Sequence, residues 1–115
     1  MPGKRILVVD DQEMLLRTVS AVLRRFNYQV ETASSAAEAL IKLGSDAFHL
    51  VITDLDMPVM AGDELARKIK CRSPMLPVIL LTAFPPKAQP PGVDLVLSKP
   101  FSVVELSNAV AAVIG

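Results

Sequence analysis

Two groups of aspartates each follow a short apolar run in this sequence. Asp10 and Asp11 come directly after residues 6–9, and Asp54 comes directly after residues 50–53 and opens the segment Asp-Leu-Asp-Met-Pro. If both runs are neighbouring parallel strands, their carboxylates meet at one edge of a sheet. Carboxylates that lie so close repel one another unless a cation lies among them. The pattern therefore predicts a Mg²⁺ site that includes a nucleophilic or phosphoryl-accepting aspartate.

A hydroxyl group and an ammonium group complete the predicted site. Thr82 follows the apolar run 78–81, and Lys99 follows the branched run 93–97. In open α/β sheets, ligands bind beyond the carboxyl ends of the strands. Phosphoryl transfer requires neutralisation of the charge on the phosphoryl oxygens, and a metal ion, a lysine and a hydroxyl can each contact one oxygen. An aspartate among these groups can attack in line and form an acyl phosphate.

Five segments are predicted as strands. Three are continuous apolar runs rich in branched residues, which are typical of strands buried on both faces of a parallel sheet. Another alternates Tyr28, Val30 and Thr32 with polar residues, which indicates an edge strand. In chain order, the predicted strands are residues 6–9, 28–33, 50–53, 78–81 and 93–97.

Four helices are predicted between or after these strands. Ser35 and Ser102 each precede a glutamate by three residues, which is a capping box that marks the start of a helix. The helix that follows Ser35 is expected to end at Gly44. The predicted helices are residues 12–26, 36–44, 63–71 and 103–113.

The alternation of strands and helices predicts a right-handed, doubly wound α/β fold. The first helix carries an apolar stripe formed by Leu15, Val19, Val22 and Phe26. The alternation is interrupted at residues 83–92, which contain two Pro-Pro pairs and a glycine. Because proline lacks an amide hydrogen and clashes inside a helix, we expect an extended, partly polyproline-II connection there.

Composition limits the classes of function. With 115 residues, of which 51% are hydrophobic, the chain is expected to form one domain, residues 1–115, with a sizeable core. The formal net charge is zero and no lysine or arginine stripe exists, so nothing supports nucleic-acid binding. We expect no membrane span and no signal peptide, because the apolar runs are too short. Cys71 is the single cysteine, which fits a reducing, cytoplasmic setting.

The order and spacing of the polar residues resemble the receiver domain of two-component response regulators. The matching motifs, spread over essentially the whole chain, are Asp10-Asp11, Asp54 with Met57-Pro58 and Gly62, Thr82-Ala83, and Lys99-Pro100-Phe101. The resemblance implies a flavodoxin-like, five-stranded parallel sheet of order 2-1-3-4-5, here with the helix between strands 4 and 5 replaced by the proline-rich loop. It also implies a phosphorelay signalling domain that catalyses only its own phosphorylation and dephosphorylation. A sensor histidine kinase or a histidine phosphotransfer protein would supply the phosphoryl group.

The same resemblance implies a role for each polar residue of the site. Asp54 is the phosphoacceptor. Asp11 and Asp54 bind Mg²⁺ directly, Asp10 assists through water, and the backbone carbonyl of Asp56 completes the protein ligands. Lys99 pairs with the phosphoryl group, and the peptide bond that follows it is cis.

Two departures from the family concern the response to phosphorylation. The resemblance implies that Thr82 moves inward to bind a phosphoryl oxygen, and many family members then rotate an aromatic ring that lies three residues before the lysine. Val96 takes that position here and cannot rotate in this way. Without the usual helix, strands 4 and 5 are expected to expose apolar groups. Phe84 and the prolines, a second copy of the chain or a kinase domain of the parent chain would cover them.

Two other functions fit parts of the pattern. A degenerate receiver would bind partners without phosphorylation, although the complete acidic set opposes this. Asp54-x-Asp56 also resembles the opening motif of haloacid-dehalogenase-type phosphatases, but Pro58 stands where that motif has threonine or valine. Within the receiver family, a stand-alone regulator and a segment of a hybrid histidine kinase both fit, and the proline-rich loop slightly favours the latter.

Overall fold

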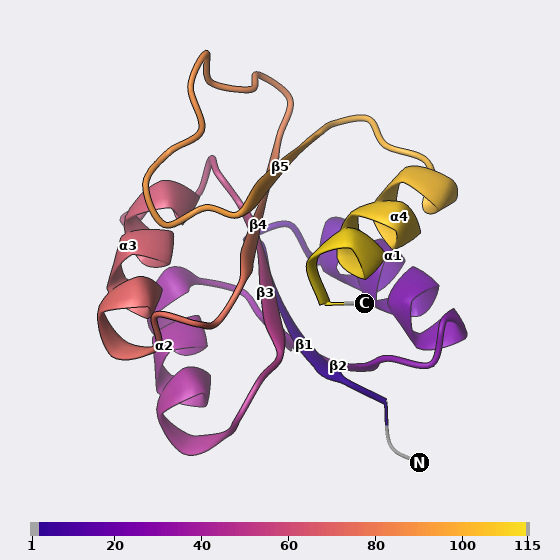
Figure 1. The fold of residues 1–115 in the computed structure, drawn as a ribbon, viewed down its shortest axis with the longest axis horizontal. Helices are drawn as coiled ribbons and strands as arrows, with labels where there is room; N and C mark the ends of the chain where they lie inside the picture. Colours follow the sequence, from indigo (N-terminus) through magenta and orange to yellow (C-terminus); the bar gives the residue numbers. More distant parts are fainter. Residues whose placement is uncertain (1–2, 115) are drawn as a thin grey trace.

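Five parallel strands form the centre of the molecule (Figure 1). The structure is a computed structural model that describes residues 3–114. The strands are β1 Arg5–Val9, β2 Gln29–Ala33, β3 Leu50–Asp54, β4 Val78–Thr82 and β5 Leu95–Ser98. Their order in the sheet is β2-β1-β3-β4-β5, and every neighbouring pair is parallel. The predicted flavodoxin-like sheet is therefore confirmed.

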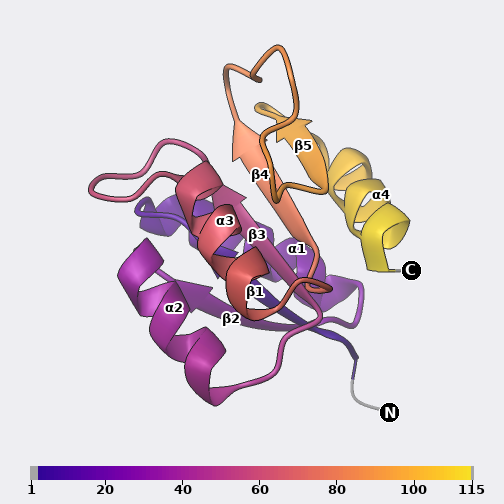
Figure 2. The ribbon, with the colours of Figure 1, turned by 60° about the vertical axis from the view of Figure 1, so that its left-hand side comes forward.

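Helices cover both faces of this sheet. The helices are α1 Glu13–Arg25, α2 Ala36–Ser45, α3 Gly62–Arg72 and α4 Val103–Ile114. α1 and α4 lie on one face, whereas α2 and α3 lie on the other, as Figures 1 and 2 show from two sides. The interior strands β1, β3 and β4 lie between two helical layers, which explains why their sequences are continuously apolar. Among the helices described for residues 3–114, none has the length and apolar character that a membrane crossing requires.

Side-chain caps fix where α2 and α4 begin. At α4, Ser102 Oγ accepts a hydrogen bond from the Glu105 N–H and Glu105 Oε1 accepts one from the Ser102 N–H, both at 3.0 Å. This reciprocal pair is the predicted capping box. At α2, Ser35 Oγ accepts from the Glu38 N–H at 3.1 Å, but the Glu38 carboxylate bonds to Ser34 instead of Ser35. The second bond of that predicted box is thus displaced by one residue.

The buried face of α1 differs from the predicted apolar stripe. The buried residues of this helix are Leu16, Val19, Ser20 and Leu23. Of the predicted stripe, only Val19 is among them, because Leu15 and Val22 are half-buried and Phe26 is exposed beyond the helix end. Apolar residues occur in adjacent pairs at 15–16 and 22–23, so spacing alone does not decide which face meets the sheet. The true face includes Ser20, a polar residue that an apolar pattern misses.

The connection between β4 and β5 contains no helix. Residues 83–94 form turns and irregular structure, and their second half packs on α3. A Cβ at Gly92 would come within 3.3 Å of the α3 backbone. Asp94 Oδ2 accepts hydrogen bonds from Lys70 Nζ and from the Val78 N–H, both at 2.8 Å. The loop therefore covers part of the sheet face itself, while its polyproline-II character stays a prediction.

Of the alternatives for covering strands β4 and β5, the Phe84 ring does not serve. Phe84 is 83% exposed, which leaves a second copy of the chain or another part of the parent chain as the candidates. The Phe84 N–H donates to Thr82 Oγ1 at 3.1 Å, which holds this residue close to the end of β4. Val93 is instead the loop residue buried on the α3 side. β4 is buried throughout, but the β5 residues Leu95, Val96 and Leu97 are only half-buried.

Candidate metal and phosphoryl site

Three aspartates meet at the carboxyl edge of the sheet. Asp10 and Asp11 follow β1, and Asp54 is the last residue of the neighbouring strand β3. One carboxylate oxygen from each of the three lies within 4.8 Å of the other two. Asp10 and Asp54 have exposed fractions of 1% and 4%, whereas Asp11 is exposed. The structure thus brings together the three aspartates that the sequence singled out.

Lys99 supplies the positive charge of the site. Its Nζ lies 2.5 Å from Asp54 Oδ1 and 4.0 Å from Asp10 Oδ2. The Lys99 N–H donates to the Thr82 carbonyl at 2.8 Å, which ties the start of the loop after β5 to the end of β4. The Lys99–Pro100 peptide bond is cis, as the family resemblance implied. One ammonium lies beside two of the three carboxylates, so the fully ionised cluster carries an excess of negative charge.

Asp10 is the carboxyl group of the cluster whose pKa is raised, mainly because it is buried. Burial raises the pKa of this carboxyl from 3.8 to about 6, the Gln12 N–H bond partly opposes the rise, and the neighbouring Asp54 carboxylate adds to it. Asp10 Oδ2 is buried and has no hydrogen-bond partner within residues 3–114. Burying a carboxylate oxygen without a partner is unfavourable. The all-oxygen donor set and this unpartnered oxygen fit a hard divalent cation such as Mg²⁺.

Asp56 and Thr82 take different positions relative to this cluster. The Asp56 side chain is exposed, and its carboxylate is not part of the three-aspartate group. Its backbone carbonyl as a metal ligand therefore stays a prediction. Thr82 is the last residue of β4 and is 1% exposed, and its strand lies directly beside β3. Its hydroxyl lies at the same sheet edge as Asp54, and it accepts the bond from the Phe84 N–H described above.

Gly62 packs directly against the end of β3. A Cβ at this position would lie 2.1 Å from the Asp54 carbonyl oxygen. The Gly62 N–H donates to the Leu55 carbonyl at 2.9 Å, which closes the loop between β3 and α3. In that loop, Val59 adopts a positive φ of 71°. The motif glycine is therefore required for a steric reason, because the first turn of α3 touches the backbone that carries the Asp54 side chain.

One contact at the site was not anticipated from the sequence. The Gln12 N–H donates to Asp10 Oδ1 at 2.8 Å. Aspartate side chains in turns commonly accept a hydrogen bond from the backbone N–H two residues further on. The position of Asp10 just after a strand could therefore have predicted this bond. The bond fixes the orientation of the Asp10 carboxylate and leaves its Oδ2 facing Lys99 at 4.0 Å.

Comparison with known proteins identifies the family. Residues 6–111 match the family model described as the response regulator receiver domain. The chain belongs to this family and is a receiver domain of phosphorelay signalling, not a classical enzyme. The haloacid-dehalogenase-type alternative is not favoured.

Relatives of different length match the chain. It is 35% identical over 112 residues to the response regulator receiver protein CpdR of Brucella abortus, with 93% of each chain covered. It is 33% identical over 117 residues to the alkaline phosphatase synthesis transcriptional regulatory protein PhoP of Bacillus subtilis. That match covers 97% of this chain but 49% of PhoP. The chain thus spans nearly all of one relative and about half of the other.

Solved structures share the fold. The chemotaxis response regulator CheY4 of Vibrio cholerae superposes with a TM-score of 0.91 at 32% identity, covering 96% of this chain and 98% of that one. The response regulator TrrA of Thermotoga maritima, solved in complex with Mg²⁺-BeF, gives a TM-score of 0.89 at 34% identity with the same coverage. Both are response regulators, in agreement with the family match.

The packing at Gly62 predicts opposite effects of alanine at two glycines. Gly62→Ala forces a methyl group against the Asp54 carbonyl, and we expect the free energy of unfolding to fall by about 1–3 kcal/mol. Gly44→Ala in α2 is the matched control, because a Cβ there meets nothing within 4 Å. It should raise the free energy of unfolding by about 0.5–1 kcal/mol. Urea unfolding measures both, and equal changes would contradict the close approach at Gly62.

Proposed function

We propose that Asp54 accepts a phosphoryl group from the phosphohistidine of a sensor histidine kinase or a histidine phosphotransfer protein. The convergence of three carboxylates and the Lys99 ammonium at one sheet edge carries this proposal. The oxygen donors favour Mg²⁺. Asp11 and Asp54 would bind the ion, Asp10 would assist, and the carbonyl of Asp56 would complete the protein ligands. The Mg²⁺-BeF complex of the related TrrA supports this choice of metal.

Each protein group has a distinct part in the transfer. When bound, Mg²⁺ neutralises charge on the carboxylates and on the phosphoryl oxygens. An Asp54 carboxylate oxygen attacks the phosphorus in line, a P–O bond forms, the P–N bond to the donor imidazole breaks, and the imidazole keeps its electron pair and takes up a proton. Lys99, which contacts Asp54 Oδ1, is placed to move its ammonium onto a phosphoryl oxygen. The buried position of Asp54 strengthens these charge interactions.

Autodephosphorylation would follow from the open side of the same site. A water molecule attacks the phosphorus of the acyl phosphate, the P–O bond to Asp54 breaks, and inorganic phosphate leaves. The Asp54 carboxylate is thereby restored. The exposed position of Asp11 leaves the metal cluster accessible to solvent. The phosphorylated state of Asp54 would therefore decay by its own hydrolysis, without a separate phosphatase.

We propose that the response to phosphorylation runs through Thr82 and residues 83–94. When the Thr82 hydroxyl turns to a phosphoryl oxygen, it gives up its bond with the Phe84 N–H. That loss frees the beginning of the loop. Because Val96 has no ring to rotate, the loop is the element left to report the change.

The side of the sheet at β5 is the proposed contact surface. Its strand residues are half-buried and Phe84 nearby is exposed, so a second copy of the chain or another part of the parent chain could cover them. We propose that residues 1–115 form one receiver domain, either alone or within a hybrid histidine kinase.

A degenerate receiver is the weaker candidate, because the acidic cluster and the Lys99 contact are complete. A cytoplasmic setting stays a prediction.

Phosphorylation of Asp54 is tested with a small phosphodonor. Incubation with Mg²⁺ and acetyl phosphate should add one phosphoryl group, seen by intact-mass spectrometry, and Asp54→Ala should abolish the addition. Asp56→Ala is the matched control: its side chain is exposed, so the variant should still be labelled. Absence of labelling in the wild type would favour an interaction-only receiver, and steady turnover of a phosphate ester would favour a phosphatase.

Lys99→Ala separates phosphoryl transfer from metal binding. Removing the ammonium takes away one contact to the developing charge, so the rate of Asp54 phosphorylation should fall by about 10²-fold or more. Mg²⁺ affinity should hold or rise, because the carboxylates lose a competing cation. Lys99→Arg, which keeps the charge, should retain more activity. Equal losses of Mg²⁺ affinity and phosphorylation rate in Lys99→Ala would contradict the assigned role.

A further inference from the structure

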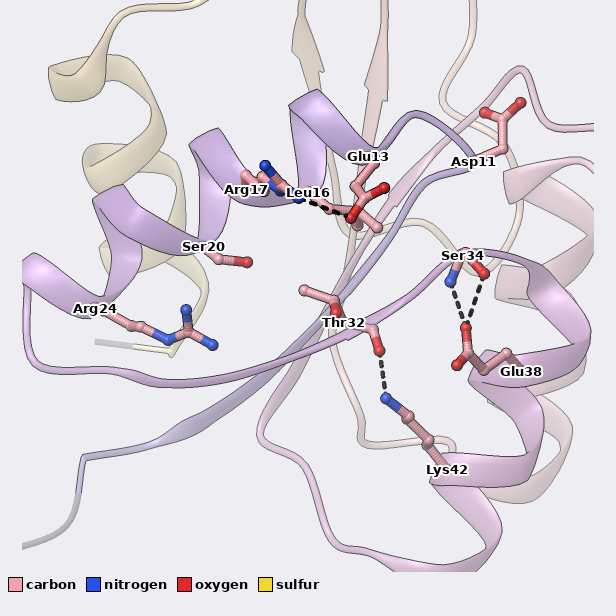
Figure 3. Close-up of a pocket in the computed structure, with 10 residues that line it drawn as sticks. All are labelled: Asp11, Glu13, Leu16, Arg17, Ser20, Arg24, Thr32, Ser34, Glu38 and Lys42. Atoms are coloured by element: carbon pink, nitrogen blue, oxygen red, sulfur yellow. Dashed lines mark hydrogen bonds and ion pairs between the residues drawn. The ribbon is translucent and has the colours of Figure 1, made fainter.

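A polar groove lies between α1 and the β2 edge of the sheet (Figure 3). Its volume is about 540 Å³, which falls within the range of small-molecule sites. Side chains from α1, β2 and α2 line it, and Leu16 is the one aliphatic residue among them. No aromatic side chain contributes to the lining. The groove therefore suits a hydrophilic ligand.

Two cations reach the outer edge of β2 from opposite sides of this groove. Arg24 of α1 donates from Nη2 to the Val30 carbonyl at 3.1 Å. Lys42 of α2 donates from Nζ to the Thr32 carbonyl, as Figure 3 shows. The two carbonyls are two residues apart on one strand, a separation of about 7 Å. Within residues 3–114, neither cation forms an ion pair with a carboxylate. Two positive charges are thus held close together, each bonded to a neutral acceptor.

Of the three carboxylates along the groove, Glu13 and Glu38 already have other partners, and Asp11 belongs to the cluster of three aspartates described above. Glu13 pairs with Arg17 at 3.2 Å. Glu38 accepts bonds from the N–H and the hydroxyl of Ser34 at 2.6 and 3.0 Å, and these bonds, with a smaller effect of Lys42, lower its pKa. The groove lining therefore carries three carboxylates and three cations, of which Arg24 and Lys42 are the two without an ion pair among the residues that the structure describes.

The Ser20 hydroxyl is an independent sign of a ligand. Ser20 lines the groove from α1 and is 2% exposed. Its Oγ has no hydrogen-bond partner within the part of the chain that the structure describes. A helical serine usually bonds to the carbonyl four residues earlier, and leaving a buried hydroxyl unpaired is unfavourable. Figure 3 shows this side chain on the same stretch of α1 as Arg24, facing β2. A ligand oxygen there would supply the missing partner.

We propose that this groove binds a sugar phosphate, with the phosphate between Arg24 and Lys42 and within reach of the Ser20 hydroxyl. Donors from α1 and α2 approach from different directions, which suits the tetrahedral oxygens of a phosphate monoester better than a planar carboxylate. The carboxylates of Glu13 and Glu38 then accept bonds from sugar hydroxyls. No aromatic side chain lines the groove, so a nucleobase would have no ring to stack against. The proposed phosphate contacts include no residue of the metal cluster, but Asp11, a proposed Mg²⁺ ligand, also lines the groove, so binding is to be measured without metal.

Protection of an edge strand is the competing explanation for the two cations. Lysines on a strand edge prevent it from pairing with another sheet. If protection is their whole role, removing Arg24 and Lys42 promotes self-association of the chain and changes no ligand affinity.

Calorimetric titration distinguishes these explanations. Wild-type protein is titrated in EDTA, at constant ionic strength, with glucose 6-phosphate, inorganic phosphate and glucose. We expect saturable binding of glucose 6-phosphate, weaker binding of inorganic phosphate, and none of glucose. The double variant Arg24→Gln/Lys42→Gln should lose affinity by at least about 10-fold, the effect of one lost charge-assisted contact. Ser20→Ala should lose less, and the exposed control Arg25→Gln should bind as the wild type does.

Each result decides the proposal. If glucose 6-phosphate shows no saturable binding, the proposed site is overturned. An equal loss of affinity for glucose 6-phosphate in Arg25→Gln and in the double variant also overturns it. Equal affinity for glucose 6-phosphate and inorganic phosphate overturns the sugar component. Self-association of the double variant with unchanged phosphate affinity establishes edge protection instead. If the double variant does not fold by circular dichroism, Ser20→Ala decides, and unchanged affinity there overturns the proposal.

Discussion

Repulsion among carboxylates at one edge of the sheet is the constraint on which this molecule depends. Parallel strands place their carboxyl ends together, so the aspartates after β1 and at the end of β3 cannot avoid one another. Lys99 relieves part of the repulsion through its 2.5 Å contact with Asp54. Burial raises the pKa of Asp10, the nearby Asp54 carboxylate adds to the rise, and one Asp10 oxygen has no hydrogen-bond partner within residues 3–114. A site held in this state gains from a divalent cation and from an added phosphoryl group that the cation and Lys99 can share.

The surrounding fold keeps these charges in place. Asp54 ends a strand buried on both faces, and Gly62 lets α3 begin directly against its carbonyl oxygen. Asp10 is oriented by the Gln12 N–H, and Lys99 is tied to β4 through the Thr82 carbonyl. Rigid main-chain contacts of this kind pre-organise charged groups, so little reorganisation is needed when charge develops during phosphoryl transfer.

The strands and the acidic cluster were predictable from the sequence, because both follow from local patterns. Buried parallel strands are continuously apolar, and polar residues that follow them must meet at one edge. Three features were missed because spacing along the chain does not determine them. The buried face of α1 includes Ser20, Phe84 is exposed, and the Glu38 carboxylate bonds to Ser34. Spacing along one segment cannot show which neighbour a side chain meets, so these features required the tertiary structure.

The central claim concerns charge, and the stability of Asp10→Asn tests it most directly. Because the pKa of Asp10 is raised from 3.8 to about 6 in the folded protein, the metal-free wild type should lose stability as pH rises through about 4 to 6 and remain penalised above that range. At pH 8 in EDTA, Asp10→Asn should therefore melt at a higher temperature than the wild type, and Mg²⁺ should raise the melting temperature of the wild type more than that of the variant. A variant that is less stable than the wild type in EDTA, or an equal response of both proteins to Mg²⁺, would contradict the account.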